Sequence, residues 1–236
     1  TLGERVEERT RERDRTWELS RDLLAIIDFD STTRALNPAW RDILGWSQEE
    51  LLDRPMADLT HPDDLRASRV AMSTLRRGRV AQRFVNRVRH RDGSYRWINW
   101  SSSPGEGHIC AIGRDITQQR RAERDLRMAA TVFEHSTAAI LVTDPAGYIV
   151  RINETFQRIT GYAGKEVLDQ LPGMLTADRQ QAAQLSYILN QLNQQGSWEG
   201  ELWLKRRDGE QFPAWVGITA VHDDDGDLAS YVCFFN

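Results

Sequence analysis

The feature that most constrains this chain is an internal duplication. Residues of the same kind recur at one fixed separation, as between Asn37 and Asn153 (153 − 37 = 116). The other matched positions are Asp28 with Asp144, Trp40 with Phe156, Gly45-Trp46 with Gly161-Tyr162, Glu50 with Glu166, and Arg91-Asp92-Gly93 with Arg207-Asp208-Gly209. A constant offset held over that much chain indicates two copies of one structural unit. The sequence therefore predicts two domains of the same fold.

A charged helix is expected between the two copies. Residues 115–133 contain no Pro or Gly, and Asp115 or Thr117 is expected to cap the start of this helix. Its apolar residues form one narrow stripe with 4-3-4 spacing, which consists of Ala122, Leu126, Ala129 and Phe133. A helix so polar elsewhere either bridges two domains through solvent or pairs with its copy in a second chain. The short stripe favours pairing.

Composition limits the classes of function. With 236 residues and 40% hydrophobic content, the chain supports two domains of about a hundred residues, each with its own core. A net charge of −4 and Arg-rich segments interleaved with acidic residues argue against nucleic-acid binding. No long apolar run or signal peptide is present, so no membrane contact is expected within this segment. Cys110 and Cys233 lie in apolar segments, which predicts buried reduced thiols and a cytoplasmic protein.

Both copies predict the same order of elements. We expect strands at 23–28, 34–37, 80–89, 94–103 and 108–114 in the first copy, with helices at 38–44, 47–52 and 61–77. In the second copy we expect strands at 139–144, 149–153, 198–206, 211–222 and 228–235, with helices at 154–160, 163–168 and 177–195. Each copy then forms a five-stranded antiparallel sheet with helices on one face, which is an α+β fold.

Short local motifs fix several boundaries. Gly45 ends the first helix, Ser47 and Glu50 form a capping box, and Asp92-Gly93 supplies a hairpin turn. Residues 1–20 are dense in charge and rich in helix formers. Their heptad-like stripe begins at Leu2 and Val6 but is interrupted by Arg9 and Arg13, so it supports a coiled coil only in part.

Two ordered sets of motifs resemble PAS domains with their C-terminal three-strand extension. The first set comprises NPAW (37–40), LGW (44–46), EEL (49–51), HPDD (61–64), HRDGSYRW (90–97) and GRDIT (113–117). The second comprises NETF (153–156), TGY (160–162), WEGE (198–201) and RRDG (206–209). The resemblance implies an N-terminal signalling helix at 1–20, PAS domain A at 21–117, a linker helix at 118–132 that starts at about 115, and PAS domain B at 133–236.

The resemblance implies a bacterial sensory module. Such a module detects a small-molecule, redox or protein signal, is a homodimer through its N-terminal and linker helices, and relays to an output domain beyond Asn236. The second copy is similar to PAS domains ahead of cyclic-di-GMP cyclases and phosphodiesterases, and the first to those of histidine kinases, so the former output is favoured. One alternative is a constitutive dimerisation scaffold without a ligand. Direct redox sensing through the two cysteines is a weaker alternative.

The sequence offers no enzyme motif. Nucleophile-elbow, Walker and His-Glu-x-x-His patterns are absent, and no two of the five histidines have metal-ligand spacing, so catalytic and metal residues are predicted to be none. His61, before Pro62, is interpreted as a helix cap. The resemblance implies that a flavin adduct needs a cysteine over the ring, whereas both cysteines lie on final strands. Haem is disfavoured because His61 lies only at the first turn of its helix.

No cofactor is favoured, although a non-covalent flavin in the second copy stays open because residues 198–203 are similar to a strand of redox-sensing PAS domains. Core packing of these aromatic residues is the favoured interpretation. The candidate pocket residues are Trp40, Trp46, Trp97, Asn99, Ser101, Phe156, Tyr162, Trp198, Trp203 and Trp215. Alternation places Trp97, Asn99 and Ser101 on one face of a strand and Ile98 and Trp100 on the other, but does not say which face lines the pocket. The candidate relay residues are Asp115, Ile116, Thr117 and Leu126.

Overall fold

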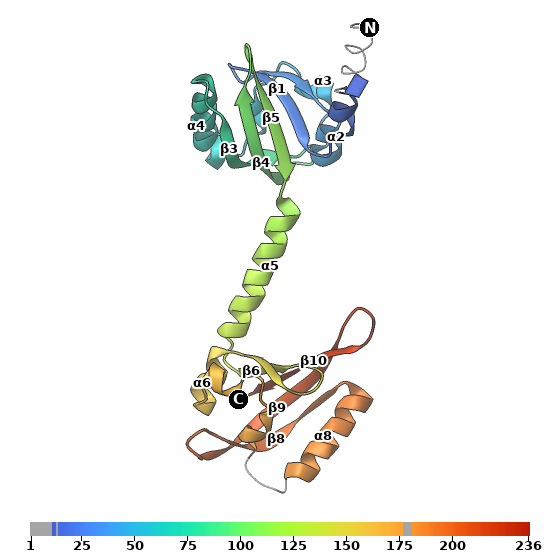
Figure 1. Ribbon diagram of the computed structural model, residues 1–236, viewed down its shortest axis with the longest axis vertical. Helices are drawn as coiled ribbons and strands as arrows, with labels where there is room; N and C mark the ends of the chain where they lie inside the picture. The colour runs from blue at the N-terminus through green and yellow to red at the C-terminus, as the bar shows by residue number, and fades with distance from the viewer. Residues whose placement is uncertain (1–10, 13, 177–180) are drawn as a thin grey trace. The chain divides into compact units, whose positions relative to one another are not determined.

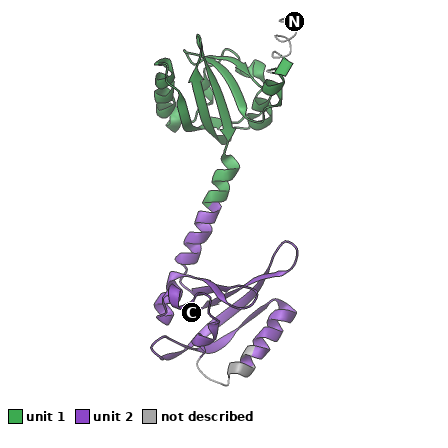
Figure 2. Ribbon diagram, viewed as in Figure 1, with its two compact units in different colours: residues 1–124 green, residues 125–236 purple. Residues whose placement is uncertain are grey.

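A computed structural model of the protein describes residues 11, 12, 14–176 and 181–236. The chain divides into two compact units, residues 1–124 and 125–236, and the division falls within helix α5 (Thr117–Glu134; Figure 2). The separation of the two units agrees with the duplication in the sequence.

The first unit is one antiparallel sheet covered by helices (Figure 1). Its strands lie in the order β2-β1-β5-β4-β3, with bounds β1 Leu23–Asp28, β2 Thr33–Leu36, β3 Ala81–Arg89, β4 Tyr95–Pro104 and β5 His108–Asp115. The helical segments between β2 and β3 are α2 Ala39–Leu44, α3 Gln48–Leu51, the 3-10 turns η1 Met56–Leu59 and η2 Pro62–Asp64, and α4 Leu65–Arg76. One hydrophobic core joins their inner sides to the sheet.

The second unit repeats this topology. Its sheet has the order β7-β6-β10-β9-β8, with bounds β6 Ala139–Thr143, β7 Ile149–Ile152, β8 Ser197–Lys205, β9 Gln211–His222 and β10 Leu228–Phe235. Its helical segments are α6 Glu154–Thr160, α7 Gly164–Val167, η3 Pro172–Leu175 and α8 Gln181–Gln195. Two five-stranded antiparallel sheets with helices confirm the predicted α+β class. The expected first turn of α8, at 177–180, lies outside the described residues.

Local motifs act where the sequence places them. Gly45 ends α2 with φ of 75°, a left-handed conformation that favours glycine, and Gly161 ends α6 in the same way with φ of 76°. The Ser47 hydroxyl accepts from the backbone N–H of Glu50, whose carboxylate accepts from the N–H of Ser47. These boundaries depend on neighbouring residues alone, which is why the sequence predicts them well.

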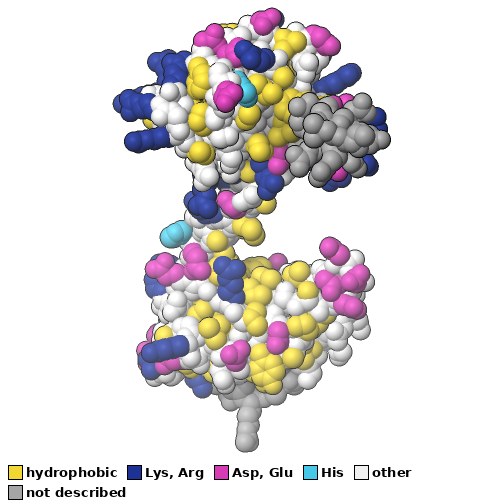
Figure 3. All heavy atoms as spheres, turned by 45° about the horizontal axis from the view of Figure 1, so that its top comes forward, with side chains coloured by type: hydrophobic (Ala, Val, Ile, Leu, Met, Phe, Trp, Pro, Cys, Tyr) yellow, Lys and Arg dark blue, Asp and Glu magenta, His cyan; other side chains and the backbone are white. Residues whose placement is uncertain are grey.

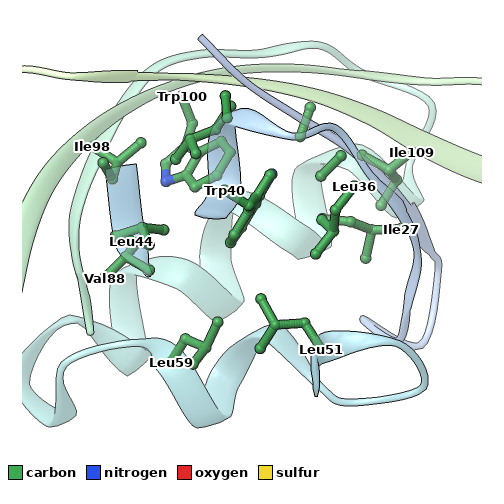
Figure 4. Packing of buried hydrophobic residues seen from close by; sticks show 14 of the residues in the cluster. Ile27, Leu36, Trp40, Leu44, Leu51, Leu59, Val88, Ile98, Trp100 and Ile109 are labelled. Carbon is green, nitrogen blue, oxygen red and sulfur yellow. The ribbon is translucent and has the colours of Figure 1, made fainter. Parts of the chain in front are cut away.

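Two tryptophans meet in the first core. The rings of Trp40 and Trp100 lie 6.0 Å apart between their centroids, and Leu51 and Leu59 approach from the helical side (Figure 4). Gly113 on β5 leaves space for the Trp100 ring, because a Cβ at that position would lie only 2.5 Å from it. In the second core, Phe156 packs against the ring of Phe235.

A buried asparagine ties each incoming segment to its sheet. Asn37 accepts from the backbone N–H of Leu24 at 2.8 Å and donates to the carbonyl of Asp22 at 3.0 Å. Asn153 accepts from the N–H of Ile140 at 2.9 Å and donates to the carbonyl of Phe133, in the last turn of α5, at 3.0 Å. The duplicated asparagines therefore have the same structural role in both units.

The entering segment is described only in part. Residues 14–19 are helical, whereas Leu2, Val6, Arg9 and Arg13, on which the coiled-coil interpretation rests, lie outside the described residues. Among the helices that the structure describes, none combines the length and the apolar character needed to cross a bilayer.

Candidate functional site

The first unit contains a cavity of about 520 Å³ between α4 and the inner face of the sheet. This volume lies within the range of small-molecule sites in proteins. Its walls are mostly apolar, with Leu65, Met72 and Leu75 from α4, Phe84 and Val88 from β3, and Ile27, Met56, Trp100 and Ala111 from the other elements. An apolar hollow of this size beneath a helix is a candidate site for a small molecule.

A row of polar side chains crosses this wall. The Asn86 side-chain carbonyl accepts from the indole N–H of Trp100 at 2.8 Å, and its amide donates to the Ser68 hydroxyl at 3.3 Å. Ser102 lies beside this row on β4, and all of these residues line the cavity. Buried polar groups that retain hydrogen-bonding capacity orient a ligand in an otherwise apolar pocket. Asp58, Arg69 and Arg76 add exposed charges to the lining.

The candidate residues of strand β4 lie on the face of the strand that points away from the cavity. Its inner residues are Ile98, Trp100 and Ser102, all of them buried. Trp97, Asn99 and Ser101 alternate with these residues, so they point to the outer face and do not line the cavity. The structure therefore decides between the two faces that alternation leaves open. The inner face is the one that the helices cover.

The other two candidates in the first unit also lie outside the cavity lining. Trp40 is 1% exposed and donates its indole N–H to the carbonyl of Leu24 at 3.0 Å, which makes it a core residue. Trp46 packs at the edge of the same core and donates to the carbonyl of Arg89 at 2.9 Å.

The candidates of the second unit divide between its interior and its surface. Phe156 is buried, and Tyr162 and Trp198 pack against the same core. Trp203 and Trp215 are 50% and 52% exposed on the other face of the sheet, and hydrophobic side chains reach the surface on the face of this unit seen in Figure 3. Of these three tryptophans, only Trp198 lies on the covered side of the second sheet, where it could contact a bound ligand.

Asn86, Ser68 and Ser102 were missed by sequence reasoning. Asn86 lies on the same face of β3 as Phe84 and Val88. An amide among apolar residues on one face of a strand was therefore the one sign of the polar row in the sequence. Ser68 and Ser102 carry no comparable indication, because serine is common on exposed helix and strand faces.

The candidate relay residues gather at the start of α5. Asp115 caps the helix by accepting from the backbone N–H of Thr117 at 2.8 Å. The N–H of Ile116 donates to the Trp97 carbonyl at 2.9 Å, and the Thr117 hydroxyl accepts from the Trp97 N–H at 2.8 Å. Leu126 lies further along the same helix and is 72% exposed. Trp97 therefore contacts the first turn of the linker helix and does not line the cavity.

The two cysteines differ in environment. Cys110 is exposed, which corrects the expectation that both thiols are buried. Cys233 packs against the second core, and burial raises the pKa of its thiol to about 12. A thiol that stays protonated at neutral pH is a poor redox centre.

His61 has the local role that the sequence predicts. His61 caps the start of η2 by accepting from the backbone N–H of Asp63 at 3.2 Å, as predicted, and no histidine lines the cavity. In the described ranges, no three side chains of the His, Cys, Asp and Glu types form a group able to hold a metal ion.

Asp64 joins the start of α4 to β3 through Arg87. The Arg87 guanidinium donates to both carboxylate oxygens, and this pairing lowers the pKa of Asp64. A lowered folded-state pKa contributes stability above the unfolded value of about 3.9, and that stability is lost as the pH falls through the folded value. Asp64→Asn should therefore lower stability at pH 7 and flatten its decline between about pH 5 and pH 3.

Urea unfolding at a series of pH values measures this effect. The matched control is Asp63→Asn, because Asp63 is 72% exposed and its contact with Arg87 is longer, at 3.3 Å. If both variants had the same pH profile as the unchanged protein, the Asp64 pair would have no part in acid stability.

Sequence comparisons match both units to one family. A PAS domain profile matches residues 137–236, and a PAS fold profile matches residues 17–121. The crystal structure of a PAS domain from Colwellia psychrerythraea is 21% identical and covers 48% of this chain and 95% of its own, with a TM-score of 0.46.

Similar curated proteins include regulators from several organisms. The nitrogen fixation regulatory protein of Klebsiella oxytoca is 30% identical over 122 residues, which is 52% of this chain and 24% of that protein. The bacterioopsin transcriptional activator of Halobacterium salinarum is 27% identical over 115 residues, 48% of this chain and 17% of that protein. Phototropin-1B of Oryza sativa subsp. japonica is 24% identical over 139 residues, 56% of this chain and 15% of that protein.

The matched segment spans about a quarter or less of the length of these relatives. The two family matches together account for most of the chain, and both five-stranded sheets share one topology. The chain therefore belongs to the PAS domain family and carries two PAS domains in tandem, with helix α5 between them.

Proposed function

We propose that this chain is a sensory module in which the first PAS domain binds a small molecule in the cavity beneath α4. The observation that carries this proposal is the polar row of Asn86, Ser68 and Ser102 on an apolar wall of ligand-sized volume. A matching ligand has an apolar body and at least one group that hydrogen-bonds to this row. We assign ligand binding and signal relay to the two PAS domains and the linker α5, and catalysis to other parts of the protein.

A flavin bound without a covalent link in the second domain stays a candidate cofactor. Trp198 packs against the core of that domain and could lie against a ring system, whereas the exposed Trp203 and Trp215 do not face the interior. When bound, a flavin would supply redox chemistry, and Trp198 would help to hold its ring. Haem has no histidine ligand in the described cavity.

The proposed output lies in a covalently attached domain beyond Asn236. Support comes from the relative named as a nitrogen fixation regulatory protein, of which the matched segment covers only 24%. A diguanylate cyclase or phosphodiesterase is favoured and a histidine kinase is next, because each copy resembles the PAS domains that accompany those enzymes. We place the module in the cytoplasm of a bacterium.

Native mass spectrometry beside the denatured mass and the visible spectrum tests ligand binding. A stoichiometric extra mass that disappears on denaturation is expected, and Asn86→Leu should lower its occupancy at least about tenfold by removing hydrogen bonds to the ligand. Asn99→Leu, on the outer face of the sheet, is the control. A protein that carries no extra mass and binds nothing from a metabolite extract would contradict the proposal.

A constitutive dimerisation scaffold is the second candidate function. It is favoured by the stripe of α5, because Ala122, Leu126 and Ala129 are all exposed in a single chain. Pairing with a second copy would bury this stripe and form a coiled coil. In the sensory proposal the same pairing, with that of the N-terminal helix, makes the homodimer through which α5 transmits the change.

Leu126→Glu should weaken this dimer about a hundredfold, because it places a charge in an apolar seam. Sedimentation velocity over a concentration series measures the loss. Thr131→Glu, which adds the same charge off the stripe, should leave the dimer intact. A Leu126→Glu dimer of unchanged affinity would show that α5 is not the pairing surface.

A further inference from the structure

Arg87 on β3 is held by the start of α4. Its guanidinium donates to the two carboxylate oxygens of Asp64 at 2.9 and 2.8 Å, and its backbone N–H donates to the same group at 2.8 Å. Only 24% of the Arg87 side chain and 17% of the Asp64 side chain are exposed. A two-point pair fixes the orientation of the guanidinium as well as its distance. Because Asp64 directly precedes α4, a displacement of that helix must move Arg87 or break the pair.

Trp97 lies opposite Arg87 on the neighbouring strand β4, and its ring contacts the Arg87 side chain. The Arg87 guanidinium lies 5.2 Å from the centre of the Trp97 ring, and the Arg120 guanidinium, from α5, lies 4.2 Å from it. The Trp97 backbone also holds both Ile116 and Thr117. Trp97 therefore holds the first turn of α5 through its backbone, and its ring contacts two guanidinium groups.

The two cations compete for that ring. A guanidinium is attracted to an indole face, but a second cation nearby repels it unless a carboxylate neutralises one of the two. Asp64 neutralises Arg87 and so permits Arg120 to remain against Trp97. If the Asp64 pair breaks, only the longer contact with Asp63, at 3.3 Å, still offsets the Arg87 charge, and the Arg120 contact is destabilised.

We propose that Asp64, Arg87, Trp97 and Arg120 form a connector that converts a displacement of the cavity helix α4 into a loosened start of the linker α5. This inference rests on the proposed function, because the cavity beneath α4 is taken as the input. The connector is distinct from the cavity lining, since none of its four residues contributes to it. Arg87 is the positioning residue, and its charge carries the effect.

Residue-resolved hydrogen exchange of this chain tests the connector. Asp64→Asn mimics the displaced state, because it removes the closer of the two carboxylates that offset the Arg87 charge and leaves that charge in place. It should raise exchange at Ile116 and at residues 120–123 about fivefold relative to the core amides of β4. The double variant with Asp64→Asn and Arg87→Gln should return these rates to within about twofold of the unchanged protein, because the repelling charge is gone.

This reversal separates the connector from a purely structural ion pair. If the pair only stabilised the fold, the double variant would exchange at least as fast as Asp64→Asn alone, and that outcome would overturn the proposal. Asp28→Asn is the control, since it removes the carboxylate of another ion pair, with Arg34 at 2.8 Å, away from the connector. It should leave the α5 rates unchanged.

A cavity variant separates the connector from the cavity itself. Ala111→Leu enlarges a side chain on the cavity wall formed by β5, and should change exchange in both α4 and the start of α5. Adding Arg87→Gln should abolish the α5 response alone, and a response that persists would contradict the connector. If Ala111→Leu changes neither helix while Asp64→Asn still loosens α5, the connector stands and the cavity is not its input.

Discussion

Phe156→Ala is expected to lower the free energy of unfolding of the second PAS domain by about 3–5 kcal/mol. Phe156 is fully buried, and its ring lies 5.9 Å from that of Phe235 between centroids. Truncation removes a large apolar group and leaves a cavity that the surrounding core fills only in part. A loss of this size approaches the whole stability of an ordinary domain, so part of the variant should be unfolded at 37 °C.

Urea titration followed through NMR signals of the second domain measures this loss. Trp215→Ala is the matched control, because it removes a larger aromatic group from the same domain at a position that is 52% exposed. It should cost less than about 1 kcal/mol. Equal losses from the two variants would show that Trp215 is buried in solution, for example by a second copy of the chain.

Asn153→Ala is expected to destabilise the second domain by about 3–4 kcal/mol. Asn153 is fully buried and makes four hydrogen bonds, accepting from the N–H groups of Ile140 and Phe156 and donating to the carbonyls of Phe133 and Ala138. Alanine leaves all four backbone groups without these partners in a site with little access to water. The same change frees the carbonyl of Phe133, so the last turn of α5 should also exchange faster.

The same titration, with amide exchange at residues 133–138, checks both effects. Asn193→Ala, an exposed asparagine of α8, serves as the control and should be neutral within about 0.5 kcal/mol. A loss below about 1 kcal/mol for Asn153→Ala would mean that water replaces the amide without difficulty. Asn37→Ala should behave similarly in the first domain, because Asn37 is 2% exposed and also holds an incoming segment.

The sequence reaches the fold because the decisive features are local or repeated. The constant offset between the copies needs no knowledge of packing, and the capping box of Ser47 and the helix stop at Gly45 depend on a few adjacent residues. The order of the strands within each sheet was not predicted from the sequence, and the structure supplies it. The hydrogen bonds at the start of α5 also involve Asp115, Ile116 and Thr117, which the sequence analysis names as candidate relay residues.

The cavity was harder to predict than the fold. Alternation groups the residues of β4 into two sets, but both sets contain a tryptophan and a small polar residue, so composition does not mark the inner set. The helices decide it by covering Ile98, Trp100 and Ser102. Trp203 and Trp215 mislead for a different reason. Large aromatic residues usually lie inside a domain, whereas these two lie on the open face of the second sheet.

By itself, then, the sequence determined the duplication, the two sheets, the helix boundaries and the linker, since each depends on periodicity or on contacts between near neighbours. Only the tertiary structure decided which side of each sheet is covered, that Cys110 is exposed, and that Asn86 faces a cavity. It also brought Asp64, Arg87, Trp97 and Arg120 together from four separate elements. Contacts between distant segments depend on the packing of whole elements, which no short pattern in the chain records.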